Sequence, residues 1–241
     1  MLLFNEKYTQ YLADVILKFI KNNDLNNIDA VCSHGHTIWH QPKKGITLQI
    51  GNLPSLAKKI KQKVVCNFRV QDVQLGGNGA PLVPIGDRLL FEKFDYCLNL
   101  GGFANVSFED QKKNRIAFDV CPVNIVMNHF AELLGKEYDD GGRIAASGKL
   151  NKVILSKLNS LEYYFKSAPK SLGMEWVQDK IVPILNNSGL SSEDILNTFV
   201  EHIAIQLAAQ FHEGSSVLIT GGGAYNKYLL DRLKWHANVT V

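Results

Sequence analysis

Apolar residues recur at helical spacing at the start of the chain and then gather in short runs typical of strands. Between Asn5 and Asn22 they fall three or four positions apart, which predicts an amphipathic helix. Strands are expected in the apolar or alternating runs at 28–33, 45–51 and 63–68, with a short helix at 53–62. The glycine-containing segment 69–84 is expected to be a long loop, and long loops inside compact domains are usually functional.

The second half begins with strands and then becomes mainly helical. Two strand-like runs around Gly101-Gly102, within 95–110, predict a β-hairpin, and 114–120 predicts a third strand. A helix should follow Pro122 and stop at Gly135. The strongest helical pattern is 191–214, with Ser191 and Asp194 as a capping box and Gly214 at its end; a strand at 216–220, a glycine turn and another helix follow. Hairpin strands together with strand-to-helix crossovers predict an α/β fold.

Composition narrows the class of protein. The 241 residues are 46% hydrophobic and 20% charged, and the formal net charge of +3 gives no general drive toward nucleic acid or membrane. The four cysteines are far apart, which favours isolated thiols in a reducing compartment over zinc pairs or a disulfide framework. No apolar run approaches the ~20 residues of a membrane span. We therefore expect a cytoplasmic protein that binds neither nucleic acid nor membrane. The last residues, 236–241, look like the start of a strand, so we suspect that a piece of the fold is missing.

Three glycine clusters lie at expected strand ends. Gly101 and Gly102 sit between adjacent strands, where main-chain N–H groups can approach an anion. The run Gly221, Gly222 and Gly223 lies between a strand and a helix, a position that favours phosphate or nucleotide. The third cluster is in the long loop. Each cluster alone is weak evidence for a phosphate or nucleotide site. Neither the Walker A spacing nor the G-x-G-x-x-G motif is present.

The best catalytic candidate is Asp119, which ends an expected strand and faces a loop that opens a helix. A carboxylate there could take a proton from water or a sugar hydroxyl, or help position Mg²⁺ through water; it could equally cap the following turn. Arg69 and Asp72 lie beside the glycine loop. Arg69 could bind a substrate carboxylate, or the two side chains could simply form a surface ion pair, which is slightly favoured.

Three histidines, His34, His36 and His40, lie within seven positions after an expected strand. A metal site would need a further carboxylate or cysteine nearby in space, and nothing in the local sequence requires one. A polar loop that lines a substrate is favoured over a metal site.

Taken together, these segments resemble the anhydro-N-acetylmuramic acid kinases, a family with the sugar kinase/Hsp70/actin fold. The resemblance runs through nearly the whole chain in an ordered set of motifs: "SHGHTIWHQP", "TLQIGN", "VVCNFRVQDVQLGGNGAPLVP", "LNLGGFANVSF", "FDVCPVN", "YDDGGRIAASG", "PKSLGMEW" and "LITGGGAYNKYLLDRL". It implies an α/β, actin-like ATPase (ribonuclease H-like) fold with two lobes: 1–94, with sugar-binding loops, and 95–241, with the phosphate hairpin, the catalytic aspartate and the adenosine segment.

The resemblance also implies a reaction: ATP-dependent, hydrolytic opening and phosphorylation of 1,6-anhydro-N-acetylmuramic acid to N-acetylmuramic acid 6-phosphate. Asp119 would be the general base, and Mg²⁺ would assist ATP. Substrate binding would fall to His34, His36, Arg69, Asp72, Gly77, Asn78 and Asn124. Nucleotide binding would fall to Gly101, Gly102, Asn105, Gly221, Gly222, Gly223 and Asn226, and no residue is directly assigned to a metal. A homodimer is implied by the same resemblance.

Some family features are absent from the sequence. The usual first phosphate loop and the C-terminal end are missing, so we expect a chain truncated at both ends that binds ATP poorly by itself. Val120, Cys121 and Val123 replace a threonine and two glycines of the catalytic motif, and His36 stands where glutamine is usual. Two alternatives stay open: a non-catalytic relative that binds a muropeptide sugar, and a metal-dependent hydrolase built on His34, His36 and His40.

Overall fold

A computed structural model describes residues 2–241 of the chain. The chain folds into two compact units, one ending at Leu82 and one comprising Val83–Val241. The expected lobe boundary, between residues 94 and 95, lies after the helix that opens the second unit. In residues 2–241 no helix is both long and apolar enough to cross a bilayer.

The first unit is built around a long amphipathic helix. Helix α1 (Leu2–Asn22) packs on α2 (Ser55–Ile60) through a small core of Ala13, Leu56 and Ile60. Strand β1 (Val31–Ser33) pairs in parallel with β4 (Val64–Cys66). Strand β2 (His36–Gln41) pairs antiparallel with β3 (Ile46–Ile50) across the short 3₁₀ turn η1 (Pro42–Lys44). The helices and strands expected in this half are therefore confirmed.

Two expectations for the first half were wrong. The histidine segment is not a loop: His36 and His40 lie in β2, because its antiparallel ladder with β3 provides hydrogen bonds that an isolated polar stretch lacks. The segment 69–84 is not one long loop either. It contains the helix α3 (Val70–Gln74), where buried Val73 anchors one turn, and the start of α4 (Val83–Leu90).

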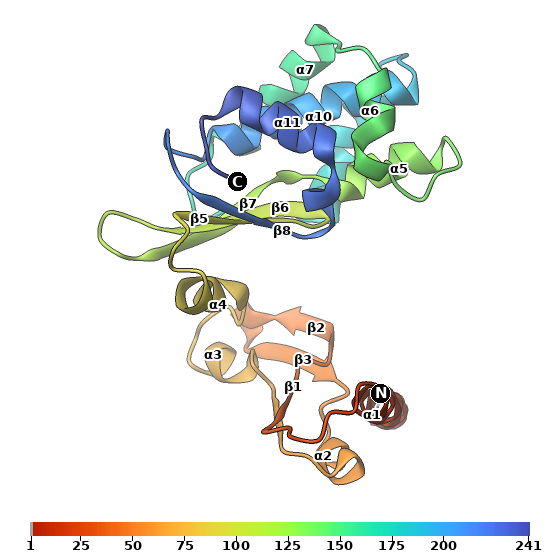
Figure 1. The fold of residues 1–241 in the computed structure, drawn as a ribbon, viewed down its shortest axis with the longest axis vertical. Helices are drawn as coiled ribbons and strands as arrows, with labels where there is room; N and C mark the ends of the chain where they lie inside the picture. Colours follow the sequence, from red (N-terminus) through yellow and green to blue (C-terminus); the bar gives the residue numbers. More distant parts are fainter. Residues whose placement is uncertain (1) are drawn as a thin grey trace. The chain divides into compact units, whose positions relative to one another are not determined.

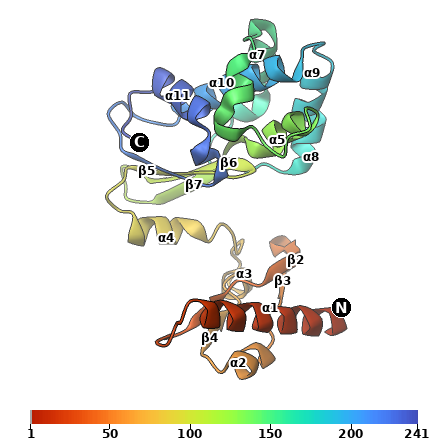
Figure 2. The ribbon, with the colours of Figure 1, turned by 45° about the vertical axis from the view of Figure 1, so that its right-hand side comes forward.

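The second unit is a four-stranded sheet with most of its helices on one face and α4 on the other, as Figures 1 and 2 both show. The strand order is β7-β6-β5-β8, with β5 (Tyr96–Leu100), β6 (Phe103–Glu109) and β7 (Arg115–Pro122) joined by antiparallel pairing and β8 (Val217–Thr220) parallel to β5. The expected hairpin around Gly101-Gly102 and the expected strands 114–120 and 216–220 are confirmed. Strand β7 continues to Pro122, however, so Asp119 lies inside the strand and not at its end.

Helices from several parts of the sequence cover the face of the sheet opposite α4. They are α5 (Asn124–Glu132), α6 (Arg143–Ser147), α7 (Lys152–Asn159), α8 (Met174–Trp176), α9 (Val182–Asn186), α10 (Ser192–Ala208) and α11 (Lys227–His236). Short turns join them: η2 (Asp140–Gly142), η3 (Glu162–Phe165), η4 (Val177–Ile181) and η5 (Gly222–Tyr225). Figure 1 shows α10 and α11 side by side above the sheet, in agreement with their direct packing.

Helix α10 is the centre of this core, since most of its length is buried. The Ser191 hydroxyl accepts from the Asp194 N–H, which confirms Ser191 as the N-cap. The Asp194 carboxylate does not complete a capping box, because it accepts from the Lys149 N–H instead. The helix ends at Ala208, well before Gly214; the expected end at Gly214 was wrong, because the Gly214 N–H donates to the Asn238 carbonyl.

Candidate active site

A row of polar residues crosses all four strands of the second unit. Thr220 of β8 is paired with Asn99 of β5, Asn99 with Asn105 of β6, and Asn105 with Asp119 of β7. Paired residues share a face of a sheet. The alternate residues of the same strands are buried under the helices: Leu98, Leu100, Ala104 and Val106. The polar row therefore lies on the other face of the sheet, which we call the open face although α4 packs on it beside the row, where Asp87 accepts from the Ser107 hydroxyl. The row includes the predicted base Asp119 and the predicted nucleotide residue Asn105.

A β-bulge follows Asp119 directly. Asn105 pairs with Asp119 and Ala104 with Cys121, so Val120 is an extra residue without a partner on β6. The bulge lets Asp119 share the open face with Asn105 while Cys121 shares the core face with Ala104. Bulges are frequent beside active sites, where they redirect a side chain.

The Asp119 carboxylate is half-buried, and that changes its chemistry. Burial raises the pKa of Asp119, and a hydrogen bond from the Leu172 N–H to Oδ2, 2.9 Å long, opposes this by stabilising the charged form. A carboxylate whose pKa is raised is a stronger base than a solvated one. Asp119 does not cap the turn that follows it, because its side chain bonds to Leu172.

The glycine turn of the β5–β6 hairpin is tied to the start of α5. The Gly102 carbonyl accepts from the N–H groups of Val123 and Ile125, and the Gly101 carbonyl accepts from Asn124. The Asn124 side-chain amide also donates to the Leu100 carbonyl, 3.1 Å away. The start of α5 and the predicted phosphate turn are thus joined by hydrogen bonds.

The residues that depart from the family motif all face the core. Val120, Cys121 and Val123 are 2%, 0% and 0% exposed. Their bulk fills the space under the helices, so it does not obstruct the open face that carries Asp119.

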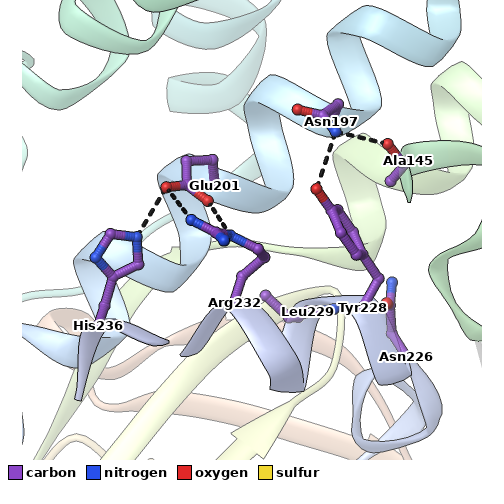
Figure 3. A network of polar contacts seen from close by, with 8 residues as sticks. All are labelled: Ala145, Asn197, Glu201, Asn226, Tyr228, Leu229, Arg232 and His236. Carbon is purple, nitrogen blue, oxygen red and sulfur yellow. Dashed lines mark hydrogen bonds and ion pairs between the residues drawn. The ribbon is translucent and has the colours of Figure 1, made fainter. Parts of the chain in front are cut away.

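The second glycine cluster packs tightly against β5. Gly221 has φ +83°, and a Cβ added there would lie 2.7 Å from the Leu100 carbonyl oxygen; one on Gly223 would lie 2.6 Å from the Leu100 side chain. Only glycine fits such positions. Asn226 (Figure 3) caps α11, its Oδ1 accepting from the Leu229 N–H. It is buried against Gly142.

A cavity of about 520 Å³ opens between this cluster and α5. Its volume lies in the range of small-ligand pockets. Aromatic rings and amide or carboxylate groups border it, and its lining includes Asn124, Asn128, Asp140, Gly222, Gly223 and Tyr225. Three predicted nucleotide residues and one predicted substrate residue therefore meet around one cavity: Gly222, Gly223, Asn226 and Asn124.

The first unit brings together a second set of predicted residues. Arg69 donates through Nε to His34 Nε2, at 3.0 Å, and through Nη1 to the Gly79 carbonyl, at 2.6 Å. Asp72 accepts from the Gly79 N–H at 2.6 Å, and its carboxylate lies where a Cβ on Gly77 would stand. Within the described residues, Arg69 and Asp72 form no ion pair with each other, so the expected surface pair was wrong: each binds the glycine loop instead.

The three histidines have separate partners and do not converge. The His34 ring bonds to Arg69 and to the Gly35 carbonyl, the His36 ring lies 6.2 Å from that of Tyr8, and the His40 ring bonds to the Thr47 hydroxyl. Across residues 2–241 no group of three or more His, Cys, Asp or Glu side chains could hold a metal ion. Asn78 is exposed in the glycine loop.

Comparison with known proteins identifies the family. The family model described as "Anhydro-N-acetylmuramic acid kinase" matches residues 2–240. The chain belongs to the anhydro-N-acetylmuramic acid kinase family. Relatives of that name include one from Methylorubrum extorquens (35% identical, covering 92% of this chain and 61% of the relative) and one from Pseudomonas syringae pv. syringae (33%, 95% and 66%). The chain thus spans somewhat less than two thirds of the length of these relatives.

Two solved structures show a weaker likeness. They are component A of the (R)-2-hydroxyglutaryl-CoA dehydratase from Acidaminococcus fermentans (15% identical, covering 77% of this chain and 65% of that one) and the ADPNP-bound activator of the 2-hydroxyisocaproyl-CoA dehydratase from Clostridium difficile (14%, 88% and 86%). Both have a TM-score of 0.43, too low to carry an argument. The predicted mixed α/β class is confirmed by the structure, and the actin-like assignment follows from membership of this kinase family.

Sequence reasoning missed part of the polar row in this anhydro-sugar kinase relative. Asn99 and Thr220 complete the row but were not predicted as site residues. A signal for Asn99 was present: it is a polar residue between Leu98 and Leu100 in an otherwise apolar strand. The contacts of Asp119 with Tyr163, Lys170 and Leu172 left no such signal, since they join segments more than forty residues apart.

Proposed function

We propose that this protein carries the catalytic base and the substrate sites of an anhydro-N-acetylmuramic acid kinase. Water adds to C1 of the 1,6-anhydro sugar while the C1–O6 bond breaks, and O6 takes the γ-phosphoryl group of ATP. The products are N-acetylmuramic acid 6-phosphate and ADP, and the water proton passes to a base. A cytoplasmic location, expected from the isolated cysteines and the composition, and a homodimer, implied by the family resemblance, belong to the same proposal.

Asp119 is the observation that carries this proposal. It is a half-buried carboxylate with a raised pKa, set by a bulge on the open face of the sheet, next to a glycine turn. A base that removes a proton from water needs this combination of basicity and access. Asn105, its cross-strand partner, can hold the same water or a sugar hydroxyl.

The 520 Å³ cavity is the proposed site of the nucleotide. Its glycine border admits close approach of a phosphate chain, and Tyr225, which is 82% exposed at the rim, offers a ring on which a base can stack. Gly101 and Gly102 would face the phosphates from the hairpin side. Mg²⁺ would neutralise the charge that develops on the transferred group; it is commonly held by substrate phosphates and one or two carboxylates, and the open-face carboxylate of Asp119 fits such a role through water.

The Arg69 cluster is the proposed site of the sugar. Arg69 is fixed by His34 and Gly79, so its remaining guanidinium nitrogen is held in place for an anion. The lactyl carboxylate of the sugar is an anion of the right geometry for such a fork. His36, Asp72, Gly77 and Asn78 belong to the surrounding segments and would supply polar contacts to the sugar ring.

Turnover in H₂¹⁸O tests the proposed reaction. Purified protein of the full length of the family, containing these 241 residues, is incubated with ATP, Mg²⁺ and 1,6-anhydro-N-acetylmuramic acid, and the products are analysed by mass spectrometry. We expect ¹⁸O on the sugar and none in phosphate, because the attacking water ends at C1. Label in free phosphate without phosphorylated sugar would show a simple ATPase and refute the proposal.

Replacing Asp119 tests the catalytic assignment. Asp119→Asn should lower kcat by about 10²–10⁴-fold, the usual contribution of a general base, with little loss of fold. Asp179→Asn is the control, since Asp179 is an exposed aspartate that pairs with its neighbour Lys180. Near-normal turnover by Asp119→Asn would rule out the general-base role.

A further inference from the structure

The motif "PKSLGMEW" at 169–176 has no part in the function proposed above, yet its backbone lies beside the candidate base. The Asp119 N–H donates to the Lys170 carbonyl, 3.2 Å away, and the Leu172 N–H donates to the Asp119 carboxylate. The main chain of residues 170–172 thus forms its hydrogen bonds with β7 at a single residue, Asp119.

The position of β7 at the edge of the sheet explains why Asp119 has partners there. Every second residue of an edge strand directs its N–H and carbonyl away from the neighbouring strand, and buried main-chain groups need partners. Besides the bond from its N–H to Lys170, the Asp119 carbonyl accepts from the Tyr163 hydroxyl at 2.6 Å. Three bonds to segment 163–172 therefore fix the amide, the carbonyl and the carboxylate of one residue.

Lys170 ties these partners to one another. Its ammonium lies 4.8 Å from the centre of the Tyr163 ring and 5.6 Å from that of Phe118, and it approaches the Tyr163 carbonyl at 3.4 Å. A cation over two aromatic faces is held by their quadrupoles. Phe118 is the residue before Asp119, so Lys170 braces both the strand and the tyrosine that binds it.

We propose that Tyr163, Lys170 and Leu172 are positioning residues for Asp119: they form a clamp that pairs the outer edge of β7 at Asp119 and holds the carboxylate on the open face of the sheet. The catalytic meaning of the clamp rests on the proposed function. The clamp itself is a property of the ligand-free protein.

The clamp also sets how basic Asp119 is. Burial raises the pKa of Asp119, and the hydrogen bond from the Leu172 N–H lowers it and so limits the rise. Burial likewise raises the pKa of Tyr163, so its hydroxyl stays protonated and remains a donor at any working pH. Because Leu172 occupies Oδ2, Oδ1 is the oxygen that the clamp leaves for water.

Two consecutive tyrosines give a matched test of the clamp. Tyr163 donates to Asp119, whereas Tyr164, with its ring centre 5.8 Å away, bonds through its hydroxyl to His202. We expect Tyr163→Phe to speed hydrogen exchange of the Asp119 amide by about three- to tenfold relative to amides of β5, which contacts neither tyrosine through a hydrogen bond; this is the effect of one lost hydrogen bond. Tyr164→Phe should leave that ratio unchanged. If the relative exchange rate of the Asp119 amide were the same in the two variants, the proposed clamp would be refuted.

Leu172 gives a second matched pair at one position. Leu172→Pro removes the N–H that binds the carboxylate, and Leu172→Ala keeps it. The pKa of Asp119, followed by the carboxyl ¹³C shift, should rise in Leu172→Pro and stay unchanged in Leu172→Ala. A rise in both variants, or in neither, would contradict the proposal. If Leu172→Pro does not fold, the tyrosine pair still decides.

Both measurements use the protein without ligands, so they separate the clamp from the reaction. A protein that lacks kinase turnover but shows the exchange and pKa changes would refute the proposed function and leave the clamp intact. A protein with turnover and no such changes would keep the function and refute the clamp. Where turnover is present, the acid limb of the pH profile of kcat/KM should move upward in Leu172→Pro and not in Leu172→Ala.

Discussion

Arg69 shows how a single residue can hold a loop and remain able to bind a ligand. Its guanidinium donates to His34 and to the Gly79 carbonyl, so the side chain that we propose to bind the sugar is already held in place in the ligand-free protein. Fixing a binding group in advance lowers the entropic cost of binding. The value of Arg69 therefore lies in its fork geometry as much as in its charge.

We predict that Arg69→Lys weakens binding of the anhydro sugar by about tenfold, with the affinity measured by calorimetry. A lysine keeps the charge but cannot reach His34, Gly79 and a carboxylate together. Arg88→Lys is the control, because Arg88 forms an exposed ion pair with Glu109 and has no part in the loop. Unchanged sugar affinity in Arg69→Lys would remove Arg69 from the binding site.

His202 makes the stability of the second unit depend on pH. It is fully buried in α10 between Asn159 and Tyr164, and burial lowers its pKa from 6.5 to about 3. The unfolded chain takes up a proton near pH 6.5 while the folded protein does not. This contribution to stability is therefore complete above pH 6.5 and is lost as the pH falls toward about 3.

We predict that the free energy of unfolding falls by up to about 1.4 kcal/mol per pH unit across that range. His202→Gln keeps a donor for Asn159 and an acceptor for Tyr164 but cannot titrate. Denaturant melts at pH 7 and pH 5 should differ clearly less in this variant than in the unmodified protein. If the free energy of unfolding changed equally between pH 7 and pH 5 in the variant and in the unmodified protein, His202 would not be the cause of the pH dependence.

At the scale of elements, α11 is attached to α10 by a hydrogen bond between Asn197 and Tyr228 and by the buried carboxylate of Glu201. Glu201 accepts two hydrogen bonds from Arg232, at 2.6 and 2.9 Å, and one from His236 at 2.8 Å (Figure 3). Burial alone would raise the pKa of Glu201, but these hydrogen bonds outweigh it and the pKa is lowered. The attachment through Glu201 is thus present above the ordinary carboxyl pKa and weakens below it.

We predict that Glu201→Gln destabilises the protein by about 2 kcal/mol, because a neutral amide cannot satisfy both a guanidinium and an imidazole. Glu162→Gln, at an exposed pair with Lys166, should cost well under 1 kcal/mol. Thermal or denaturant unfolding compares the two. Since α11 follows the Gly221–Gly223 turn, Glu201→Gln should also weaken nucleotide binding. Equal stability of the two variants would show that the attachment contributes little.

Elements in which apolar residues recur with a clear period were predictable from sequence. Elements that depend on partners distant in sequence were not. The spacing of Tyr8, Leu12 and Ile16 identified α1, and the apolar run around Leu98 identified β5. Strand β2 was missed because five of its six residues are exposed, which leaves no alternation to read. The bulge at Val120 was missed because it is defined by pairing with β6 and has no pattern of its own.

For the whole molecule, the candidate site was only partly predictable. Motifs such as "FDVCPVN" and "LITGGGAYN" pointed to Asp119 and Gly222, and the structure places the first in the polar row of the sheet and the second beside the cavity. The clamp of Tyr163 and Leu172 could not be predicted from the sequence, since its hydrogen bonds form only after segments distant in sequence are brought together. Contacts of that kind are a product of the fold and are not written in any local pattern.

The two units differ greatly in the size of their cores. The first unit buries a cluster of Ala13, Leu56 and Ile60, whereas the second buries a continuous core that extends from β5 through α10 to α11. Since buried apolar area is the main source of stability, the second unit should hold its fold alone and the first should not.

We predict that a fragment of residues 83–241 unfolds cooperatively in calorimetry, while a fragment of residues 1–82 shows no cooperative transition. The larger fragment should also retain whatever nucleotide affinity the intact chain has, because the cavity and both glycine clusters lie within it. Sugar affinity should be absent from it, since the Arg69 cluster lies in the other unit. Sugar binding by the 83–241 fragment, or loss of its nucleotide affinity, would contradict the assignment of one ligand to each unit.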